Sequence, residues 1–111
     1  MIDRLTSDPF VAPQSSLTVT VTGETREHAH IRCAGEIDQF TAPRLADALA
    51  AAVPGRRLVE VDLSDVTFMD SSGINTLVQH RRPGCDLIVV DVPPRIRRVL
   101  EMTGVDQLFC R

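Results

Sequence analysis

The sequence predicts an α/β fold in which a mixed four-stranded sheet carries packed helices, in the order β-β-α-β-α-β-α. Two runs with apolar residues at alternate positions, residues 17–23 and 29–35, flank a short polar turn and indicate a hairpin. Two later strand-like runs each follow a segment with helical spacing, and such crossovers make neighbouring strands parallel. The length of 111 residues fits one domain.

The N-terminal part of the chain has no apolar period. Residues 1–15 mix prolines, charges and isolated apolar residues, which predicts a loosely ordered tail before a domain at residues 16–111. After the hairpin, residues 36–40 are expected to form a loop. The first helix is predicted over residues 41–53, because Thr41 can cap it, Pro43 suits its first turn, and Leu45 and Leu49 share one face.

The second half of the chain repeats the alternation of strand and helix. Residues 57–63 are predicted as a strand and residues 64–69 as a short connection. A second helix is expected to begin at Ser71 or Ser72 and to end in the turn at 81–84. Residues 86–90 form a continuous apolar run of strand length, and residues 93–104 begin with proline and end with glycine, as a third helix would.

Composition argues against several classes of protein. The net charge is −3 and the pI about 5.5, which disfavours a nucleic-acid binder. The three cysteines are odd in number and form no CxxC, and the three histidines are scattered, so we expect no disulfide framework, metal or cofactor. Cys33 is expected to pack as a small apolar residue.

No 18-residue apolar stretch or signal peptide is apparent, so a cytoplasmic protein without a membrane span is expected. The sequence contains neither GxSxG nor a nucleotide-binding glycine motif, and we expect no enzymatic activity.

The stretch "FMDSSGIN", residues 68–75, lies where a strand is expected to give way to a helix. Phe68 and Met69 are expected to anchor this junction in the core. The acid and two hydroxyls that follow are all good N-cap residues, and Gly73 lacks a Cβ, so that a neighbouring or partner backbone could approach closely. The simplest interpretation is a capped helix. The second hydroxyl and the first-turn glycine favour a functional one, a phosphoacceptor serine at a helix N-terminus that stabilises an anion.

Three segments carry a resemblance to a known family. "VDLSDVTFMDSSGINTLV", residues 61–78, resembles the signature of STAS domains, and within them of the bacterial anti-sigma factor antagonists. "GEIDQFTAPRLADAL", residues 35–49, is similar to the family's segment after the second strand. "PPRIRRVLEMTGVDQLF", residues 93–109, is similar to its last helix. Together the matches extend over about residues 17–109, and they imply a STAS-like sheet with helices packed on it.

The resemblance implies a switch in bacterial transcription regulation and stress response. Family members bind an anti-sigma serine kinase when unphosphorylated and so free a sigma factor; the kinase phosphorylates them and ends the interaction, and a serine phosphatase resets it. The acceptor serine matches Ser71. The matched residues expected to contact the partner are Asp38, Asp70, Ser72, Gly73 and Ile74.

Two further points follow from the resemblance. The stretch from Ser71 to Gly84 is only fourteen residues long, which implies a second helix about one turn shorter than the family's. The alternative function is a non-phosphorylated STAS module, serving as a structural or accessory subunit of a transporter or of a stress-signalling complex. The hydroxyl pair after Asp70 favours the phosphorylation switch.

Overall fold

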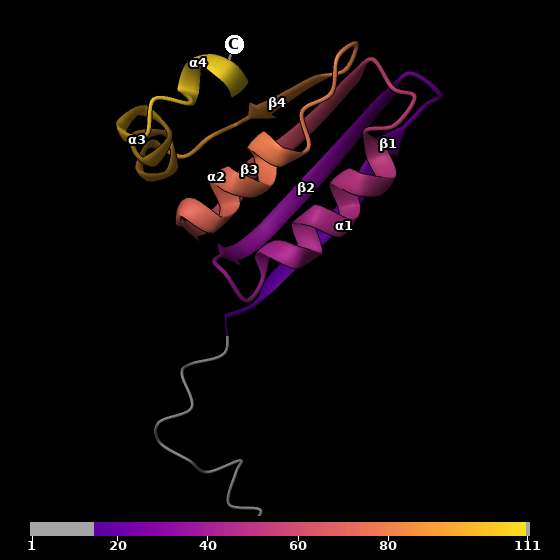
Figure 1. Ribbon diagram of the computed structural model, residues 1–111. Helices are drawn as coiled ribbons and strands as arrows, with labels where there is room; N and C mark the ends of the chain where they lie inside the picture. The colour runs from indigo at the N-terminus through magenta and orange to yellow at the C-terminus, as the bar shows by residue number, and fades with distance from the viewer. Residues whose placement is uncertain (1–14, 111) are drawn as a thin grey trace, which may run out of the picture.

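The protein folds around one mixed sheet (Figure 1), seen in a computed structural model that describes residues 15–110. The predicted tail lies outside the described residues, except for Ser15. The strands are β1 (Leu17–Glu24), β2 (His28–Ile37), β3 (Leu58–Met69) and β4 (Asp86–Val90), in the spatial order β1-β2-β3-β4. The β1–β2 pair is antiparallel, and the β2–β3 and β3–β4 pairs are parallel. The predicted mixed sheet is therefore confirmed.

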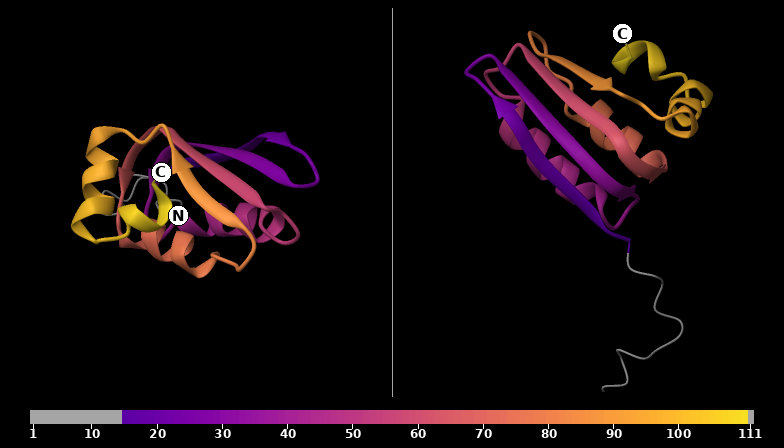
Figure 2. Two further views of the ribbon diagram at one scale, coloured as in Figure 1. Left: turned by 90° about the horizontal axis from the view of Figure 1, so that it is seen from above. Right: turned by 180° about the vertical axis from the view of Figure 1, so that it is seen from behind.

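The helices are α1 (Ala42–Ala52), α2 (Ser71–Gln79), α3 (Pro94–Met102) and α4 (Asp106–Phe109). Figure 2 shows α1 and α2 together on one face of the sheet, with α3 and α4 beside the β4 edge. The core fills the space between sheet and helices. It is built from the inward residues of the strands, such as Ile31 and Val61, and from the apolar faces of the helices, such as Leu45 and Leu77. Cys33 is buried in this core, as predicted, and burial raises the pKa of its thiol to about 12.

β3 is longer than the sequence predicts, because the expected connection at residues 64–69 continues the strand. Its final residues pair with the end of β2, from Ala34↔Asp65 to Ile37↔Met69, and the register shifts once before this stretch and once within it. These irregularities change which residues face inward. Leu63, Val66 and Met69 are all buried although they are three positions apart, and this spacing hides a strand from any search for period-two alternation. β2 likewise continues to Ile37, into the predicted loop.

A glycine lies where β1 begins beside the end of β2. Gly35 has φ +121, and a Cβ built there would lie 2.2 Å from the carbonyl oxygen of Ser16. The N–H of the next residue, Glu36, donates to that same carbonyl at 2.9 Å. Only glycine fits both the backbone conformation and the close approach. This contact fixes the start of β1 against the strand that leads into the first helix.

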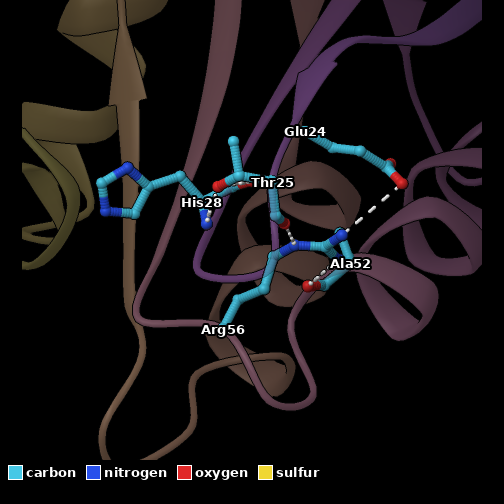
Figure 3. Close-up of polar contacts among 5 residues, drawn as sticks. All are labelled: Glu24, Thr25, His28, Ala52 and Arg56. Carbon is cyan, nitrogen blue, oxygen red and sulfur yellow. Dashed lines mark hydrogen bonds and ion pairs between the residues drawn. The ribbon is translucent and has the colours of Figure 1, made fainter.

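At the opposite end of the sheet, Arg56 joins the turn between β1 and β2 to the end of α1 (Figure 3). Its Nε donates to the carbonyl of Thr25 at 3.0 Å, and Nη1 donates to the carbonyl of Ala52 at 2.9 Å. Nη2 lies 3.6 Å from Oε2 of Glu24. The turn itself is closed by His28, whose N–H donates to the Thr25 hydroxyl at 3.0 Å. One guanidinium therefore satisfies a carbonyl at the helix end and holds the hairpin turn.

Candidate functional site

The candidate site lies at the carboxyl ends of β2 and β3, where both strands lead into helices. Ile37 and Met69, the last residues of the two strands, are paired in register. The N–H of Asp70 donates to the carbonyl of Ile37 at 3.2 Å, which ties the two strand ends together. The loop at residues 38–41 and the start of α2 therefore meet at one edge of the sheet. Two motifs that lie about thirty residues apart in the sequence form a single surface, as expected where parallel strands end together.

Asp70 is the N-cap of α2. Its backbone is extended, with φ −114 and ψ −168, and its Oδ1 accepts from the N–H of Ser72 at 2.8 Å. Its carbonyl accepts from the N–H of Gly73 at 3.1 Å, which begins the helical pattern. Of the three candidate caps in "DSS", the aspartate alone caps the helix with its side chain. The two serine hydroxyls are therefore not needed for capping.

Ser71 is the first residue of α2 and is exposed. Among residues 15–110, none forms a hydrogen bond with its hydroxyl. Ser72 is half-buried, and its carbonyl accepts from the hydroxyl of Thr76 at 2.8 Å. Ser71 is thus the more exposed of the two serines. It lies at the positive end of a nine-residue helix, where an added anion is favoured.

Gly73 and Ile74 lie inside the protein. A Cβ at Gly73 would lie 2.8 Å from Cγ of Met69 and 2.9 Å from Cγ2 of Ile37, so the close approach that glycine permits is made by the protein's own core. The space at Gly73 is thus taken up by the protein's own core, and the expected contact of Gly73 with a partner stays a prediction. Ile74 is only 6% exposed and packs in the same core, and its expected contact with a partner stays a prediction.

Asp38 organises the loop that precedes α1. Its Oδ1 accepts from the N–H of Phe40 at 2.9 Å and from that of Thr41 at 3.1 Å, and its Oδ2 accepts from the Ser15 hydroxyl. The bond from Ser15, together with the weaker bonds from the two N–H groups, lowers the pKa of Asp38, against an opposing effect of burial. An ionised carboxylate therefore fixes the geometry of the loop. The expected contact between Asp38 and a partner stays a prediction.

Thr41 does not cap α1 with its side chain, contrary to the prediction. Its hydroxyl is turned back toward the strand, where it donates to the carbonyl of Glu36 at 2.7 Å and accepts from the N–H of Asp38 at 3.0 Å. The sequence correctly places Thr41 at the helix boundary. It does not reveal that the nearby aspartate takes over the exposed N–H groups of the turn.

Two exposed aromatic rings flank the site, and the sequence analysis missed both. Phe40, in the loop after Asp38, is 74% exposed. Phe68 is 47% exposed, so the expectation that it anchors the junction is wrong, whereas Met69 is buried as expected. The alternation of β3 turns Met69 toward the helices and Phe68 toward the other face. An aromatic residue within the polar run "DQFT" was the available signal for Phe40.

Other features of the molecule lie elsewhere or point to no chemistry. A cavity of about 530 Å³ lies between β4 and α4, lined by Arg81, Ile88 and Leu108 among others. Within residues 15–110, no group of three or more acidic, histidine or cysteine side chains could hold a metal ion. In the same part of the chain, no helix has both the length and the apolar character needed to cross a membrane.

Comparison with known proteins agrees with this geometry. The family model described as "Mlab, STAS domain" matches residues 20–110. The chain is 32% identical over 84 residues to an anti-sigma-B factor antagonist of Staphylococcus aureus, covering 71% of this chain and 78% of the relative. It is 29% identical over 99 residues to the anti-sigma-B factor antagonist of Listeria monocytogenes, covering 85% and 87%.

A solved structure is also similar. The crystal structure of an anti-sigma factor antagonist from Mycobacterium paratuberculosis superimposes with a TM-score of 0.76 and 31% identity, covering 86% of this chain and 84% of that one. The chain therefore belongs to the STAS domain family, among the anti-sigma factor antagonists.

Proposed function

We propose that this protein is an anti-sigma factor antagonist switched by phosphorylation of Ser71. In the unphosphorylated state it binds an anti-sigma serine kinase in the cytoplasm and so frees a sigma factor. The kinase supplies ATP; the Ser71 oxygen forms a bond to the γ-phosphorus, ADP leaves, and the hydroxyl proton passes to a base of the kinase or to water. A serine phosphatase hydrolyses the phosphate and restores the first state. The protein itself is a binding partner and substrate, not an enzyme, and needs no cofactor.

One observation carries this proposal: the hydroxyl of Ser71 is exposed at the start of a helix that is already capped by Asp70. Because the cap does not depend on Ser71, a phosphate can be added there without removing a hydrogen bond that holds the helix. The helix N-terminus favours the new anion by about 0.3–1 kcal/mol at an exposed site. We therefore expect the fold to be retained after phosphorylation.

The same phosphate acts strongly on a partner. The site surface already carries the carboxylates of Asp38 and Asp70, so a phosphate on Ser71 adds about two negative charges beside them. Like charges brought together at an interface cost several kcal/mol. A loss of about 3–4 kcal/mol weakens binding by roughly a hundred- to a thousandfold. This effect is several times the intramolecular one, and it is the basis of the switch.

The test uses the anti-sigma kinases of the source organism, each purified and mixed with ATP and this protein. Wild type is expected to gain one phosphate, located on Ser71 by peptide mass spectrometry, and Ser71→Ala to gain none. Ser72→Ala tests the neighbouring hydroxyl and should still gain one phosphate on Ser71. Calorimetric titration and melting of the phosphorylated form should give lost affinity with a retained melting transition.

Four outcomes would contradict the proposal. A phosphate found on Ser72 would show that Ser71 is not the acceptor. Unchanged affinity after phosphorylation, or a loss of affinity accompanied by a collapsed melting temperature, would remove the switch. Stable binding of wild type with no phosphorylation would favour the accessory-module alternative.

A further inference from the structure

We propose that Phe40 and Phe68 are the apolar anchors by which the anti-sigma kinase holds this protein, separate from the charged groups that switch the complex. The proposal rests on the function proposed above, because it names the surface through which that function acts. The two rings are among the most exposed large apolar side chains of the described residues, and they come from the two loop-and-strand ends that form the candidate site.

Phe68 lies within reach of any enzyme that binds Ser71. They are three positions apart in sequence, so their Cα atoms are at most about 11 Å apart. A standard interface covers about 800 Å² on each partner, a disc of roughly 16 Å radius. Phe68 therefore lies close enough to Ser71 for one partner to contact both, at the edge of the sheet where β3 ends.

Phe40 belongs to the same surface through backbone contacts. The strand end that leads into its loop is bound to Asp70, since Ile37 accepts from the Asp70 N–H at 3.2 Å. The N–H of Phe40 donates to Asp38 Oδ1 at 2.9 Å, which fixes the backbone that presents the ring. A ring carried on an ordered loop loses little conformational entropy when a partner binds it. Phe40 is therefore exposed and yet already held in place.

The surroundings of the rings define the partner surface that fits them. Buried aromatic residues surrounded by polar groups supply most of the energy at the centre of many interfaces. Here the neighbouring groups are carboxylates, at Glu36, Asp38 and Asp70, all of them half-buried. The complementary surface is an apolar pocket bordered by basic side chains. The rings are neutral, so their contribution persists in salt, whereas contributions from the exposed charges are screened.

The experiment measures binding of the unphosphorylated protein to the purified anti-sigma kinases of the source organism, at low and at high salt. Phe40→Ala and Phe68→Thr are each expected to weaken binding at least tenfold, by a similar factor at both salt concentrations and mainly through faster dissociation. Threonine is chosen at Phe68 because it suits a strand. Met102→Ala is the matched control, since Met102 is 78% exposed on α3, and it should bind within twofold of wild type. Phosphorylation of Ser71 by the same kinase should show a raised KM with an unchanged kcat in both phenylalanine variants.

The outcomes separate this inference from the proposed function. If Ser71 is phosphorylated normally and both variants bind and react like wild type, the anchor assignment is wrong while the switch stands. If wild type binds none of the kinases, the proposed function fails and the anchors fail with it. If sedimentation shows a dimer of this chain that Phe40→Ala dissolves without altering kinase binding, the surface serves a second copy and the inference is overturned.

Discussion

Replacing Gly73 by alanine tests whether this glycine serves the core or the surface. The added Cβ would meet Cγ of Met69 at 2.8 Å and Cγ2 of Ile37 at 2.9 Å, and both side chains are buried. Overpacking of a buried site costs about 1–3 kcal/mol. Alanine is favoured over glycine by up to about 1 kcal/mol in a helix interior, and less in the first turn. The net expectation is a loss of about 1–2 kcal/mol in the free energy of unfolding.

Urea denaturation and thermal melting measure this loss. With an unfolding entropy of about 2.1 cal/mol/K per residue, 1–2 kcal/mol lowers the melting temperature of this chain by about 4–9 °C. Asn75→Ala, at an exposed position of the same helix, is the control for helix propensity and should be neutral or slightly stabilising. In a Met69→Ala background, which removes one of the two contacts, Gly73→Ala should cost at least about 1 kcal/mol less. A Gly73→Ala variant as stable as wild type, or strict additivity of the two changes, would refute the packing argument.

Three other predictions concern the rest of the fold. Arg56→Ala should lower the free energy of unfolding by about 1–3 kcal/mol, because it removes charged donors from two backbone carbonyls; Arg57→Ala, whose exposed side chain lies 3.8 Å from Glu27, should cost less than about 1 kcal/mol in the same urea titration. Asp38→Asn should destabilise the protein at neutral pH and progressively less in acid. The pKa of Asp38 is lowered on folding, so its ionised form stabilises the fold above the unfolded pKa of about 3.9, and this stability is lost as pH falls through the folded pKa. An equal loss of stability at pH 7 and pH 3 would contradict this. Cys33 should resist a thiol reagent at pH 8 until the chain unfolds, and stability should decline as pH rises from about 9 toward the folded pKa of about 12, since the unfolded chain loses this proton first.

Much of the fold could be predicted because local signals and tertiary packing agree. The alternation of β2, the helical spacing around Leu45 and the apolar run of β4 each satisfy both. Asp70 could be predicted as a cap because its chemistry acts on residues close in sequence. These features depend on neighbours within a few positions, which one sequence displays directly.

The errors arise where distant residues decide the outcome. The continuation of β3 depends on its irregular pairing with β2, which no local pattern reports. The direction of Phe68 follows from that pairing, and the neighbours of Gly73 include Ile37, thirty-six positions earlier. The same limit applies to the candidate site, where the motif around Ser71 is visible in the sequence but the 74% exposure of Phe40 depends on how its loop folds.

The unbroken course of β3 has a consequence for how such proteins diversify. The strand has twelve residues and so extends about 35–40 Å, with Arg56 just before one end and Ser71 just after the other. Substitutions that far apart contribute to stability almost independently. Selection can therefore raise or lower the thermal tolerance of the domain at one end without altering the candidate site at the other. Duplicated copies in one genome are free to acquire separate partners by changing a few residues around Ser71 while inheriting the same scaffold.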